Sequence, residues 1–117
     1  MFPGLGKLFS RTAAAFEAIG PAATVFLGSL LLSLIAAQSG TLNRDGMLYV
    51  DTARAFLEGG FNTAHNTFEW PFLPILMAMV SQVTGLGLEG SGHLLNGLFM
   101  AGACALLVTS ASRMFPE

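Results

Sequence analysis

The feature that most constrains this chain is a long stretch without charge near its N-terminus. No Asp, Glu, Lys or Arg occurs between Glu17 and Arg44, and within that gap residues 18–38 supply about the 20 apolar residues that a membrane-spanning helix needs. The whole composition agrees, since 53% of the residues are hydrophobic and 10% are charged, whereas soluble domains carry about 25% charged residues. We therefore predict an all-α integral membrane protein whose first transmembrane helix is residues 18–38.

Basic residues before this stretch set its predicted orientation. Lys7 and Arg11 precede the first span, and cytoplasmic flanks are enriched in Lys and Arg. We therefore expect residues 1–17 in the cytoplasm and the residues after the span on the outer side of the cell (inner) membrane. A secretory signal peptide, with its basic start, apolar core and small residues before a cleavage site, is the alternative. It is less favoured because the apolar core is long and no soluble domain follows.

Two further apolar stretches follow, and they differ in length. The first has prolines at its start and glycines at its end, which predicts a helix over residues 71–84 of roughly 21 Å, too short for a hydrocarbon core of about 30 Å. Residues 90–112 are long enough, and Arg113 follows them directly. Two spans return residues 113–117 to the cytoplasm, as the positive-inside rule favours. Three spans, which would leave Arg113 outside, stay open as the alternative.

Residues 39–89 are then an extracytoplasmic loop, and the sequence predicts an amphipathic helix near residues 45–59 at the membrane surface. Apolar residues recur there at helical spacing, and charged residues occupy another face. The charged face is formed by Asp51, Arg54 and Glu58, which we interpret as a solvated surface with weak ion pairs. Asn43 or Asp45 can cap the start of this helix, and the glycine pair after Glu58 can end it.

The polar and aromatic residues 61–70 connect this helix to the interfacial apolar helix. Glu69 lies at the edge of the apolar helix, where an acid can take part in proton transfer, and Trp70 suits the bilayer interface. His65 with Glu69 would supply only two metal ligands, which is a weak signal. No metal-binding residue is therefore assigned, and a divalent metal ion as a cofactor stays an open question.

The order of features from "NRDGMLYVDTARAFLEGG" to "EWPFLPILMAMVSQVTGLGLEGSGHLLNGL" resembles the N-terminal part of the polytopic GT-C glycosyltransferases, of the dolichyl-phosphate-mannose protein mannosyltransferase and aminoarabinose transferase type. In that family an acidic residue follows the first span and opens a helix that ends near glycine, and a proline-containing apolar segment precedes the second span. Arg44, Asp45 and Tyr49 match the first element, and Glu69 with the prolines after it is similar to the second.

The resemblance implies transfer of a sugar from a polyprenyl-phosphate donor to an acceptor at the extracytoplasmic membrane face. Asp45 would match the carboxylate that orients or deprotonates the acceptor hydroxyl, and Glu69 would be a further acid at the acceptor site. The residues expected to bind substrate are Arg44, Tyr49, His65 and Trp70. Family members have many more spans, so the resemblance also implies an N-terminal fragment whose partners are membrane lipid, the lipid-linked donor and the remainder of the enzyme.

A small non-catalytic membrane protein is the alternative interpretation. The short chain and the glycines in its apolar stretches, which permit close approach of helices, suit a helix-packing partner subunit. Neither interpretation involves nucleic acid, because the net charge is −2 and no cluster of Lys and Arg occurs.

Overall fold

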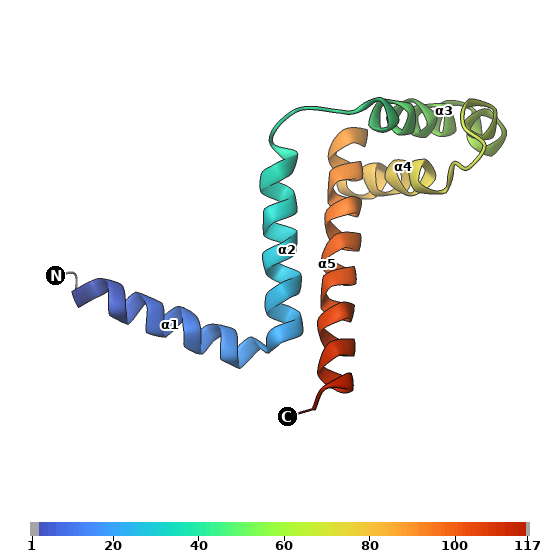
Figure 1. Ribbon diagram of the computed structural model, residues 1–117. Helices are drawn as coiled ribbons and strands as arrows, with labels where there is room; N and C mark the ends of the chain where they lie inside the picture. The colour runs from blue at the N-terminus through green and yellow to red at the C-terminus, as the bar shows by residue number, and fades with distance from the viewer. Residues whose placement is uncertain (1–2, 117) are drawn as a thin grey trace. The chain divides into compact units, whose positions relative to one another are not determined.

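The computed structural model describes residues 3–116, and helices are the only regular elements within that range (Figure 1). In chain order they are α1 (Pro3–Ile19), α2 (Pro21–Ala37), α3 (Arg44–Thr67), α4 (Phe72–Thr84) and α5 (Leu88–Met114). The all-α prediction is therefore confirmed for this part of the chain. The two ends predicted to be cytoplasmic include residues 1, 2 and 117, which lie outside the described residues.

Helix α5 is the element best suited to cross a membrane. Within residues 3–116 it is the one unbroken helix that is long and apolar enough to do so, and an 18-residue stretch of it has a mean hydropathy of 1.8. Its 27 residues extend about 40 Å at a rise of 1.5 Å per residue, which exceeds a hydrocarbon core of about 30 Å. The helix contains all of the predicted span at residues 90–112 and extends it by one half-turn at each end.

The first predicted span is interrupted at Gly20. Helices α1 and α2 meet there at a bend of 114°, and Gly20 has a φ of +85°, a conformation that glycine adopts without the steric cost of a side chain. Pro21 then opens α2, because proline lacks an N–H and suits the first position of a helix. The 17 residues of α2 extend about 25 Å, so a second complete span at residues 18–38 stays a prediction.

The described chain divides into two compact units. Unit 1 comprises α1, α2 up to Leu32 and α5 from Leu98 onward, and unit 2 is Ser33–Gly97. In unit 1 the first turn of α2 and the last turns of α5 line a common hollow. Large apolar side chains on these helices are more than half exposed, among them Leu31 and Leu107. Such exposure is compatible with a lipid environment for unit 1.

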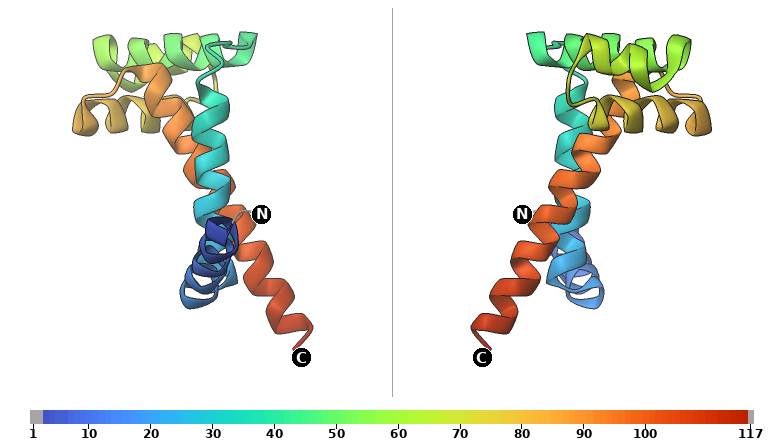
Figure 2. Two further views of the ribbon diagram at one scale, coloured as in Figure 1. Left: turned by 90° about the vertical axis from the view of Figure 1, so that its left-hand side faces the viewer. Right: turned by 90° about the vertical axis from the view of Figure 1, so that its right-hand side faces the viewer.

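Unit 2 is built around an antiparallel pair formed by α3 and α4 (Figures 1 and 2). Its core comprises Ala53, Met77, Ala78 and Leu95, contributed by α3, α4 and α5. The two alanines are fully buried, and their small side chains let α3 and α4 approach closely. Tyr49 and Phe56 pack against this core, as their helical spacing predicts, whereas Leu57, which the same spacing places with them, is 42% exposed.

Two glycines shape the helix ends of unit 2. Gly85 has a φ of +76° and caps α4 in the left-handed conformation, as expected for a glycine at this position. Gly60 interrupts α3 with a φ of +75° and a ψ of −164°, but the chain resumes helical structure and continues to Thr67. The predicted end near residue 59 is thus a kink, and part of the predicted connecting segment is helical.

Candidate functional site

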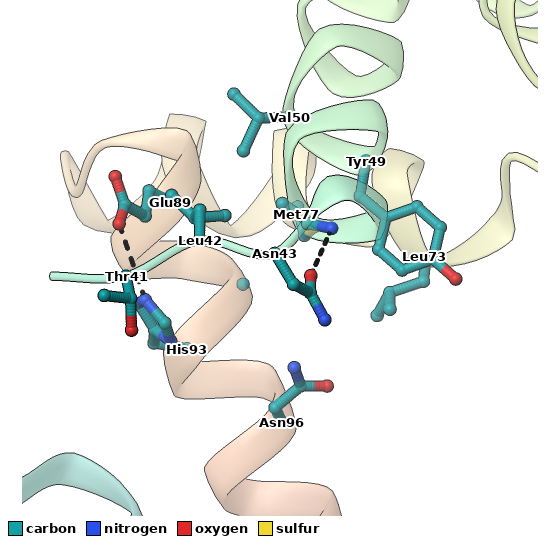
Figure 3. A pocket seen from close by; sticks show the side chains of 12 residues that line it. Thr41, Leu42, Asn43, Tyr49, Val50, Leu73, Met77, Glu89, His93 and Asn96 are labelled. Atoms are coloured by element: carbon teal, nitrogen blue, oxygen red, sulfur yellow. Dashed lines mark hydrogen bonds and ion pairs between the residues drawn. The ribbon is translucent and has the colours of Figure 1, made fainter. Parts of the chain in front are cut away.

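A pocket of about 260 Å³ lies in unit 2 where the start of α3, helix α4 and the first turns of α5 meet (Figure 3). Its polar side chains are Thr41, Asn43, Tyr49, Glu89, His93 and Asn96. Its apolar side chains are Leu42, Val50, Leu73 and Met77. Ligand sites commonly combine an apolar lining with a few convergent polar groups, in pockets of about 300–1,000 Å³. This pocket has that character at a small size.

Contacts between residues close in the chain position several of the polar side chains that line the pocket. The Asn43 side-chain oxygen accepts the backbone N–H of Gly46 at 2.7 Å, which caps α3 and leaves the Asn43 amide nitrogen able to donate to a ligand. Glu89 and His93 approach to 3.6 Å with partly exposed side chains, a contact that is an ion pair only when the imidazole is protonated. Figure 3 shows the amides of Asn43 and Asn96 facing the same space.

Asn43→Ala is expected to lower the free energy of unfolding of unit 2 by about 1 kcal/mol, because it removes the side-chain cap of α3. Thermal unfolding followed by circular dichroism in detergent micelles measures the change. Asn66→Ala is the matched control, since Asn66 is an exposed residue of α3 that does not line the pocket. Equal unfolding temperatures for the two variants would contradict the capping role.

The structure separates the two capping candidates proposed from sequence. Asn43 is the N-cap of α3, and Asp45 lies in the first turn with an exposed side chain. The positive end of the helix dipole favours a carboxylate at this position. Arg44 is also exposed, and neither Arg44 nor Asp45 lines the pocket, although Asn43 and Gly46 on either side of them do.

The kink at Gly60 brings the two sequence elements of the resemblance toward each other. The ring of Tyr49, from the first element, contacts the ring of Phe68 with centroids 5.6 Å apart, and Phe68 directly precedes Glu69. Leu73, which lies between the two prolines of the second element, lines the same pocket as Tyr49. Glu69 is exposed in the connection between α3 and α4 and does not line the pocket.

His65 and Trp70, the remaining predicted substrate-binding residues, also lie outside the pocket lining. His65 Nδ1 donates a hydrogen bond of 3.1 Å to the backbone carbonyl of Glu69, and its ring stacks on Phe61, so His65 holds the connection between α3 and α4. Trp70 is 78% exposed, as a residue at a bilayer interface can be.

Within residues 3–116 no group of three His, Cys, Asp or Glu side chains lies close enough together to hold a metal ion.

The pocket contains a polar face of α5 whose residues are not among the site residues predicted from the sequence. Glu89, His93 and Asn96 follow one another at i, i+4 and i+7, which places them on one side of a helix. That spacing is the signal that could have identified them.

Asp51 and Arg54 of α3 form an exposed ion pair of 3.1 Å, the weak surface interaction expected from sequence.

Comparison with known proteins identified no relative: no protein-family model, curated protein or solved structure matches the chain.

Proposed function

We propose that this chain is the N-terminal segment of an integral membrane glycosyltransferase that uses a polyprenyl-phosphate sugar donor at the extracytoplasmic membrane face. The supporting observation is that Tyr49, which matches the first element, lines a pocket beside the first turn of α3 together with Leu73, which lies between the two prolines of the second element. Asp45 occupies that first turn between two pocket-lining residues. Helix α5, whose first turns line this pocket, is long and apolar enough to span a bilayer.

The proposed reaction uses Asp45 as general base. Its carboxylate takes the proton of the acceptor hydroxyl while the hydroxyl oxygen bonds to the anomeric carbon of the sugar. The bond between that carbon and the phosphate oxygen breaks, and the polyprenyl phosphate leaves with the electron pair. Glycosyl transfer passes through an oxocarbenium-like state, which a neighbouring carboxylate stabilises electrostatically. Glu69, exposed beside Phe68, would orient the acceptor.

A donor comparison tests this proposal. The complete protein in phospholipid vesicles is supplied with radiolabelled mannose or glucose, linked either to polyprenyl phosphate or to a nucleotide, together with membrane extract as the source of acceptor. We expect labelled product from a lipid-linked donor and none from the nucleotide sugars. Labelling from nucleotide sugars alone would overturn the proposal. Absence of transfer from every lipid-linked sugar would favour the non-catalytic helix-packing subunit instead.

A further inference from the structure

The polar pocket of unit 2 adjoins an apolar groove, and His93 lines both. The groove has a volume of about 410 Å³, and its apolar side chains include Leu34, Leu86 and Leu94. Gly90 and Leu94 lie four residues apart on one side of α5, and Leu86 lies in the turn just before this helix. The groove thus follows the start of α5, where His93 separates it from the pocket that Glu89 lines. A polar compartment next to an apolar one matches the two parts of an amphiphile.

The charge of the pocket restricts the head group it can accept. Among the described residues that line the pocket, Glu89 is the one Asp, Glu, Lys or Arg. No described Arg or Lys lines the pocket to pair with a phosphate, and the imidazole of His93 lies 3.6 Å from the Glu89 carboxylate. An ammonium group would instead form charge-assisted hydrogen bonds with the carboxylate.

We propose that unit 2 binds a membrane lipid with a primary ammonium head group. Glu89 receives the ammonium group, the amides of Asn43 and Asn96 supply hydrogen bonds to neighbouring polar atoms of the head group, and an acyl chain occupies the groove beside Leu94. This lipid would occupy the α5 side of the same pocket that supports the proposed function, and its binding does not depend on sugar transfer. The partially exposed Glu89 and His93 leave the head group an entry from the aqueous side.

Binding of short-chain lipids to the purified protein in detergent tests the proposal without any transfer reaction. Dihexanoyl phosphatidylethanolamine, phosphatidylcholine and phosphatidylglycerol are compared by isothermal titration calorimetry. We expect the ethanolamine lipid to bind about tenfold more tightly than the other two, because only its head group offers N–H donors to a carboxylate. Glu89→Gln should remove this preference. Glu58→Gln, which removes an exposed carboxylate of α3 outside the pocket, should retain it.

A second variant tests the groove. A Cβ at Gly90 would meet only the Leu86 Cβ, at 3.9 Å, so Gly90→Leu can be accommodated by α5 while its side chain fills the groove. We expect it to weaken binding of all three lipids by a similar factor. Equal affinities of the wild-type protein for the three lipids, or equal effects of Glu89→Gln and Glu58→Gln, would overturn the head-group assignment. Binding of ethanolamine alone as tightly as the lipid would overturn the role of the groove.

Discussion

Asp45→Asn is expected to lower sugar transfer from a lipid-linked donor by about 10²–10⁴-fold, the usual contribution of general acid–base catalysis. Asparagine has nearly the same size but cannot take the proton of the acceptor hydroxyl. The side chain of Asp45 is exposed, and Asn43 supplies the cap of α3, so the substitution should leave the fold intact. Turnover in vesicles, together with the helix content of the variant from circular dichroism, measures both effects.

Asp51→Asn is the matched control for Asp45. Asp51 lies on the same helix, is exposed, and pairs with Arg54 at 3.1 Å, an interaction of about 0–1 kcal/mol at a surface. We expect its transfer rate to stay within about twofold of wild type, since 1.4 kcal/mol corresponds to a factor of ten in rate and a lost surface charge costs far less. Equal losses for the two variants would show that the local charge, and not a base at residue 45, matters.

The helices best predicted from the sequence are those whose ends are marked by proline or glycine, or by the limits of an apolar stretch. Proline before α4 and Gly85 after it mark both ends, and the apolar length of α5 marks its extent. The break at Gly20 and the continuation of α3 beyond Gly60 were not predicted. A glycine is compatible with the end of a helix, with a kink or with an uninterrupted helix. Which of these occurs depends on contacts made by later residues, such as the burial of Ala64.

The sequence predicts only the part of the candidate site that lies at the start of α3. Asn43, Asp45 and Tyr49 stand close together in the chain, so capping and helical spacing place them in the first turns of one helix. The contribution of Glu89 and His93 from α5 depends on packing among three helices. The sequence shows that these residues share a face of α5, but it does not show which surface that face meets.

Gly60→Ala is expected to destabilise unit 2 by about 1–3 kcal/mol, because a φ of +75° with a ψ of −164° lies in a region that is essentially restricted to glycine. A Cβ at Gly60 would meet no heavy atom within 4 Å, so the cost arises from the backbone conformation and not from crowding. Relief of the strain would straighten the kink and separate the rings of Tyr49 and Phe68, which are now 5.6 Å apart. Thermal unfolding of the variant in detergent micelles measures the loss.

Gly90→Ala separates backbone strain from the general effect of replacing a glycine. Gly90 belongs to α5, does not have a positive φ, and an added Cβ would lie 3.9 Å from Leu86, an ordinary contact. Alanine is favoured over glycine in a helix by up to about 1 kcal/mol, so this variant should be as stable as wild type or more stable. If both variants lower the unfolding temperature equally, the kink at Gly60 is not a conformation that unit 2 requires. If only Gly60→Ala does, the fold-back of α3 that brings Phe68 onto Tyr49 depends on this one glycine.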